Sequence, residues 1–232
     1  MYLRLLVIAI APGIAFALAA YLTDRFDREP LPLLTKVFIL GALSVLPVSI
    51  AEQFLVSTNL FTGLFNIMFV SFIVAGLTEE YFKRLVVLKI AYNNTAFNEK
   101  LDGIIYSIFA ALGFATIENI LYVVIRFSAN PYIGYYRGLL SVPGHMLFAI
   151  TMGYYLSLAK FAPNNNEKRT FLRKSLTVPA LLHGIFDFIL MAEIPLLLAL
   201  FVPYVIYLWV VNLKKLRLYY NESKLAAHHS ES

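Results

Sequence analysis

Long, uninterrupted apolar runs limit the fold of this chain more than any other feature of its sequence. A run of about 20 apolar residues crosses the roughly 30 Å hydrocarbon core of a bilayer. Such runs occupy residues 3–23, 33–56, 61–92, 101–127, 138–161, 171–192 and 195–213. They are uniformly apolar and do not alternate, and a spanning segment must satisfy its own backbone, so helices are favoured over a barrel. We therefore predict an all-α, polytopic transmembrane bundle of about seven spans.

The composition agrees with a membrane protein. With 60% hydrophobic and 14% charged residues, the chain cannot be an ordinary soluble globular protein. The absence of cysteine excludes disulfides and thiolate-bound metals, so any metal would have to be held by His, Asp or Glu. We expect residues 1–220 to form one membrane domain and residues 221–232 to form a disordered, polar cytoplasmic tail.

The placement of the basic residues predicts the orientation in the membrane. Sixteen of the 19 Lys and Arg residues lie in or beside the connections on one side. Only Arg4, Arg126 and Arg137 lie on the other side. Because cytoplasmic loops carry the excess of Lys and Arg, we predict an external N-terminus and a cytoplasmic C-terminus. The net charge of +5 therefore reflects membrane topology, and we expect a lipid bilayer but no nucleic acid as a partner.

Ionisable residues inside the apolar runs are the candidates for function. Such groups cost several kcal/mol and tend to face a cavity, a partner or a substrate path. The adjacent carboxylates of Glu79 and Glu80 interrupt the third run, and Lys83 has the helical spacing to form an ion pair with either. The other groups are Glu118 in the fourth run, His145 in the fifth, and His183 with Asp187 in the sixth.

Each of these groups alone could be structural, because His183 and Asp187, for example, are four residues apart and could satisfy each other. Together they come from four spans that carry almost no other deep charge, so convergence on one site solves the burial problem of all of them. Carboxylates with two histidines can coordinate a cation such as Zn²⁺, or act as general base and oxyanion stabiliser without a metal. Both arrangements activate water. The reaction class that they indicate is hydrolysis inside the membrane.

The depth of these residues in the membrane tests whether they can converge on one site. In the predicted topology, Glu118, His145 and His183 lie between the midplane and the outer third, whereas Glu79 arrives near the inner surface. The groups can meet only if the third span continues well past Arg84, so that residues 85–92 are still in the membrane. We adopt that longer span as a prediction.

Three motifs follow one another in the spans: EExxK from Glu79 to Lys83, FxxxE from Phe114 to Glu118, and HxxxD from His183 to Asp187. With the loop Asp24-Arg25-Phe26-Asp27-Arg28-Glu29-Pro30 and the tripeptide Pro143-Gly144-His145, they give the chain a pattern that resembles the PrsW-type intramembrane proteases. That family is related to the CAAX-processing and bacteriocin-processing membrane proteases. The resemblance covers nearly the whole chain.

The resemblance implies a multi-pass protease of the bacterial cell membrane that makes the site-1 cut in a single-span substrate such as an anti-sigma factor. It leaves open whether the enzyme uses a metal such as Zn²⁺ or depends on glutamate alone. The related CAAX proteases more often carry His and Asn where this chain has Glu118 and Asp187, so its site is more acidic.

We assign Glu79 as the general base, because Lys83 lies four residues on along the same helix face and could hold it ionised. Adjacent helical residues point about 100° apart, so the two carboxylates are not expected to aim at one water from the same face, and Glu80 would support the site or bind a second partner. His145 and His183 would be metal ligands or oxyanion stabilisers, and Glu118 a ligand or proton acceptor. Asp187 would orient His183, and it completes the candidate metal set of His145, His183, Glu118 and Asp187; Phe114 would support the site.

Two other functions are compatible with buried carboxylates and histidines in membrane spans. A proton- or ion-coupled transporter predicts related halves and paired broken helices, and the sequence shows neither. A non-catalytic membrane scaffold would not need every motif position, and all of them are present.

Overall fold

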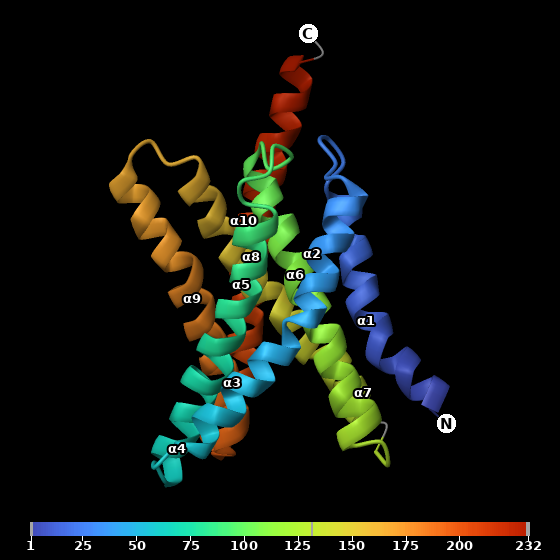
Figure 1. The fold of residues 1–232 in the computed structure, drawn as a ribbon, viewed down its shortest axis with the longest axis vertical. Helices are drawn as coiled ribbons and strands as arrows, with labels where there is room; N and C mark the ends of the chain where they lie inside the picture. The colour runs from blue at the N-terminus through green and yellow to red at the C-terminus, as the bar shows by residue number, and fades with distance from the viewer. Residues whose placement is uncertain (1, 131, 231–232) are drawn as a thin grey trace.

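The computed structural model describes residues 2–130 and 132–230, and within them the chain is helical and has no strand. The helices follow one another as α1 (Tyr2–Thr23), α2 (Leu31–Leu43), α3 (Val45–Ser57), α4 (Gly63–Phe69), the π-helix η1 (Val70–Leu77), α5 (Thr78–Ile90), α6 (Lys100–Ile120), the π-helix η2 (Leu121–Arg126), α7 (Tyr132–Leu139), α8 (Ser141–Lys160), α9 (Asn165–Ala192) and α10 (Pro195–Ser230). Several of them join end to end into longer rods (Figure 1).

Seven of these rods are long and apolar enough to cross a membrane. They cover Tyr2–Thr23, Leu31–Ser57, Gly63–Ile90, Lys100–Arg126, Gly134–Lys160, Asn165–Ala192 and Pro195–His229. The predicted all-α bundle of about seven spans is therefore confirmed. The start of α1 and the end of α10 lie at opposite ends of the molecule, as an odd number of crossings requires (Figure 1).

The centre of the bundle is the pair α6 and α8, whose side chains are almost all buried. These helices approach closely where Gly103 faces Gly153. A Cβ on Gly153 would lie 2.2 Å from the carbonyl oxygen of Gly103, so only glycine fits there. Small residues allow this contact between membrane helices. The same two helices carry Glu118 and His145, which therefore sit on the most buried part of the bundle.

The end of the chain differs from the sequence prediction. We expected disorder from residue 221, but α10 continues to Ser230; residues 231–232 lie outside the described residues. The extension packs on the bundle, since Ser223 is buried and Glu222 forms a 2.9 Å ion pair with Lys100. Good helix formers such as Lys224 and Leu225 also favour helix there.

Candidate active site

The third rod positions the two adjacent carboxylates. It is helical from Gly63 to Ile90 and so continues past Arg84, as the depth argument required. Its π-helical segment η1 ends directly before the turn that carries Glu79 and Glu80. Single π turns within α-helices often occur at functional sites, because they rotate the following side chains.

A close backbone contact fixes this rod against α9. A Cβ on Gly76 would lie 2.7 Å from the carbonyl oxygen of Ala180, and one on Gly184 would lie 2.4 Å from the ring of Phe72. The two helices can therefore approach only because glycine stands at these positions. His183 lies beside Gly184 in this contact, which brings its ring to the turn that carries the carboxylates.

Lys83 lies at the centre of the site. Its side chain is fully buried, and its ammonium nitrogen lies 2.9 Å from Glu79 Oε2, 2.9 Å from Glu80 Oε1 and 3.0 Å from His145 Nδ1. It also lies 4.3 Å from the centre of the Phe114 ring, a cation–π distance. The expectation that the two carboxylates face apart is wrong at the level of the carboxyl groups. Their flexible side chains bend toward the shared ammonium, although their Cα–Cβ bonds diverge.

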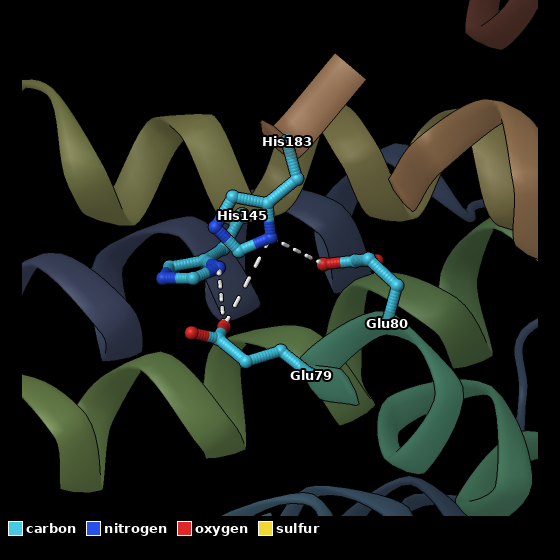
Figure 2. A group of neighbouring side chains, drawn as sticks. All are labelled: Glu79, Glu80, His145 and His183. Atoms are coloured by element: carbon cyan, nitrogen blue, oxygen red, sulfur yellow. Dashed lines mark hydrogen bonds and ion pairs between the residues drawn. The ribbon is translucent and has the colours of Figure 1, made fainter. Parts of the chain in front are cut away.

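Two histidines complete the group from the opposite side (Figure 2). His183 Nδ1 lies 3.1 Å from Glu80 Oε1 and 4.0 Å from Glu79 Oε2, and His145 Nδ1 lies 3.9 Å from Glu79 Oε2. The two imidazole planes are perpendicular, with centroids 5.2 Å apart. The groups that the sequence placed on separate spans therefore meet at one point.

The outer nitrogen of each histidine contacts a further carboxylate. His145 Nε2 lies 2.9 Å from Glu118 Oε2, and His183 Nε2 lies 3.4 Å from Asp187 Oδ2. An ammonium can only donate, so Lys83 requires His145 Nδ1 to accept, and the ring proton of a neutral His145 is then on Nε2, directed to Glu118. Glu118 and Asp187 thus orient the rings from outside.

The donor atoms of Glu79, Glu80, His145 and His183 fit a metal ion. All four residues are buried, and one ligand atom from each lies within 4.8 Å of the others. Two imidazoles with carboxylates are a usual ligand set for Zn²⁺. In addition, Glu80 Oε2 is buried and has no hydrogen-bond partner among the described residues, which a bound cation would supply. The ammonium of Lys83 shares three of the four donor atoms, so it competes with any metal for them.

The metal set predicted from the sequence needs a correction. His145 and His183 belong to the converging group, but Glu118 and Asp187 do not. They contact the outer ring nitrogens, because each lies on the far side of its histidine. The carboxylates that share a centre with the two histidines are those of Glu79 and Glu80.

A cavity of about 590 Å³ opens beside this group. Glu79 lines it together with His145, His183 and Asp187, whereas Glu80 and Lys83 lie behind this wall. Its opposite wall is α3, which begins after a break at Ser44, three residues before Pro47. Glu79 is therefore the carboxylate of the pair that a molecule in the cavity can reach.

Two residues of the cavity wall were not recognised from the sequence. Arg137, expected only as an external charge, forms a 2.9 Å ion pair with Glu118 and donates from Nε to Asn119 Oδ1 at 3.1 Å. Glu52, on α3, also lines the cavity. A helical stripe on α3 could have indicated it, because the lining residues there recur at i, i+3 and i+4: Val45, Val48, Ser49, Glu52, Gln53 and Val56.

The family model and the relatives that match this chain agree on one family. The model of a family described as PrsW family intramembrane metalloproteases matches residues 29–213. The chain is similar to a Protease PrsW of Clostridioides difficile (strain 630), with 45% identity over 97% of this chain and 94% of that protein. It is also similar to those of Bacillus subtilis (strain 168), with 37% identity over 89% and 91%, and of Halalkalibacterium halodurans, with 34% over 92% and 96%. No solved structure matches this chain.

Proposed function

The chain belongs to the PrsW family of intramembrane metalloproteases, and from this premise we propose that it hydrolyses a peptide bond of a membrane-anchored protein in the cavity beside Glu79. It is a multi-pass bacterial membrane protease. The observation that carries the proposed site is the convergence of four buried donors from three spans, of which Glu79, His145 and His183 line one cavity.

Glu79 is the proposed general base. It is the member of the carboxylate pair that faces the cavity, and its Oε2 lies 2.9 Å from the ammonium nitrogen of Lys83. It would take a proton from the attacking water and deliver it to the leaving nitrogen. General acid–base catalysis of this kind contributes roughly 10²–10⁴-fold to rate.

His145, His183 and Glu80 are the residues that would hold a metal. Two histidines and a glutamate leave the fourth position of a catalytic zinc open. A bound metal would supply polarisation of the water and of the scissile carbonyl. Glu118 and Asp187 hold the two rings in place through their outer nitrogens, and partners of this kind typically contribute about 10–100-fold to metal affinity or activity.

The proposed substrate is a single-span membrane protein such as an anti-sigma factor, cut at site 1. The motif resemblance supports this choice. The residues that line the cavity on α3 are half apolar and half polar, the polar ones being Ser49, Glu52 and Gln53, as an unwound membrane segment with exposed peptide groups would need.

The test is cleavage of candidate single-span substrates by purified protein. Glu79→Gln and Glu80→Gln are expected to lose activity by at least about 10²-fold. Glu193→Gln makes the same chemical change at an exposed residue and should leave the rate unaltered. Zinc content should fall in His183→Ala, and a chelator should inactivate the wild type reversibly. Full cleavage by both glutamine variants at wild-type protein levels would overturn the assignment.

A further inference from the structure

A second cavity, lined by none of the active-site residues, lies between the end of α1 and the last turns of the membrane part of α10. Its volume is about 600 Å³. Its lining combines apolar side chains with cationic and aromatic ones, among them Leu22, Leu213, Leu216, Arg25, Arg217 and Tyr220. We call it the α1–α10 groove.

The two arginines of the groove are free. Both side chains are exposed, they come from different elements, and neither makes a hydrogen bond or an ion pair with any residue that the structure describes. Other basic groups at this end of the bundle are engaged: Lys100 pairs with Glu222 at 2.9 Å, and Lys160 donates to the carbonyl oxygen of Tyr92 at 2.6 Å. The groove therefore contains two guanidinium groups that no carboxylate of the described residues neutralises. Together they form a site for an anion from outside the protein.

The groove also lies where the apolar parts of both of its helices end. The apolar part of α10 ends at Leu213, and Lys214 and Lys215 follow it directly. On the other wall, α1 ends at Thr23 and the chain turns into a charged loop. Leu213 is 46% exposed and Leu22 is 59% exposed, so the apolar floor is open to a bound chain.

A ring contact holds the groove open in its present shape. Phe26, in the loop after α1, packs on Tyr220 of α10 with ring centroids 5.5 Å apart. This contact ties the loop that carries Arg25 to the helix that carries Arg217. The two positive charges are therefore placed by packing and not only by their flexible side chains.

The geometry points to the α1–α10 groove as a binding site for one anionic glycerophospholipid, with its phosphate between Arg25 and Arg217 and an acyl chain along the leucines. Guanidinium groups bind phosphate through paired N–H donors, and basic pockets between membrane helices hold anionic headgroups. A soluble phosphate shares the charge but not the acyl chain, so the apolar floor selects the lipid. The site is independent of the protease chemistry.

The experiment measures lipid retained by the intact, purified chain. Native mass spectrometry in detergent compares phosphatidylglycerol with phosphatidylcholine for the wild type, the double variant Arg25→Gln/Arg217→Gln and the control Arg28→Gln/Lys224→Gln. The control removes the same charge from the same end of the molecule but from residues outside the groove. Since each basic residue contributes roughly fivefold to the affinity for an anionic lipid, we expect about a 30-fold loss of phosphatidylglycerol binding in the groove variant and little change in the control.

Three results would overturn the proposal. Equal loss in the control would show a diffuse charge effect, and unchanged binding in the groove variant would place the lipid elsewhere. Displacement of phosphatidylglycerol by millimolar inorganic phosphate would show an anion site with no need for an acyl chain. Thermal melting of both double variants confirms that they are folded.

Discussion

The buried ammonium of Lys83 is what makes two adjacent carboxylates tolerable in the apolar bundle. It contacts Glu79, Glu80 and His145 at 2.9–3.0 Å, and it has no exposed surface. Removing one partner from a buried ion pair costs about 3–5 kcal/mol, because the other charge stays behind. The spacing of the EExxK motif therefore has a physical reason: Lys83 is one helical turn from both carboxylates.

Arg137 gives a prediction at the same scale. It pairs with Glu118 at 2.9 Å, and the same oxygen of Glu118 contacts His145 Nε2. Arg137→Gln should lower kcat about 10–100-fold with little change in KM, because it releases the carboxylate that orients His145. Arg137→Lys should recover part of the loss. Arg126→Gln, a nearby arginine that does not contact Glu118, is the matched control, and an equal loss there in steady-state cleavage would contradict this role.

At the scale of elements, the joint between η1 and α9 decides where the site forms. The π-helical segment rotates the turn that follows it, and glycines permit the backbone contact that brings His183 to this turn. The hydrophobic periodicity of the sequence predicts neither the π-helical segment nor the glycine contact, because η1 is apolar on all sides. Geometry of this kind becomes visible only when both helices are in place.

Gly76→Ala tests this joint. The added methyl would meet the carbonyl oxygen of Ala180 at 2.7 Å, and because backbone cannot yield easily, we expect a loss of about 1–3 kcal/mol of stability together with reduced activity. Gly144→Ala is the control, as its methyl would make ordinary contacts of 3.6 Å with Phe186. Thermal melting in detergent and cleavage rates measure both effects. A melting temperature unchanged by Gly76→Ala would show that the helices are not in contact.

Buried carboxyl groups in the loop between α1 and α2, and Glu99 before α6, determine how stability is expected to depend on pH. Burial raises the pKa of Asp24 to about 6 and that of Glu99 to about 7, and burial with the nearby carboxylate of Asp102 raises the pKa of Glu29. As pH rises, the unfolded chain loses these protons first, at its ordinary pKa near 4. The stabilisation is therefore complete below about pH 4 and is lost progressively as pH rises through the folded-state values.

We accordingly expect the melting temperature to fall between pH 5 and pH 8. Glu29→Gln keeps a hydrogen-bonding group beside Tyr106, whose hydroxyl donates to Glu29, and it removes one titration. Its melting temperature should fall less over the same interval. The exposed Glu193→Gln serves as control, and a parallel decline in all three proteins would rule out this origin.

At the scale of the whole molecule, the cavity and the basic residues lie toward opposite ends. The cavity lining reaches Val56 and Met191, close to the ends of α3 and α9. These ends adjoin the connections that are poor in Lys and Arg. With the orientation predicted from charge, the substrate segment would enter from the external half of the membrane, and the α1–α10 groove would lie at the cytoplasmic surface.

The orientation can be measured directly, because the sequence has no cysteine. Thr58→Cys lies before the third rod and Thr95→Cys after it, so the two labels report opposite sides. A membrane-impermeant thiol reagent should label Thr58→Cys in intact cells and Thr95→Cys only after permeabilisation. The reverse pattern would invert the topology and place the cavity on the cytoplasmic side.

The sequence by itself determined the number of spans, their limits to within a few residues in most cases, and the residues that meet at the site. It could do so because membrane thickness and the cost of buried charge are local constraints, readable from run length and from Glu79, His145 or His183 inside a run. The tertiary structure alone decided which atoms face one another. The placement of Glu118 and Asp187 on outer ring nitrogens, the roles of Arg137 and Glu52, and the packed end of α10 depend on helix rotation and close approach between distant segments, and no local pattern encodes these.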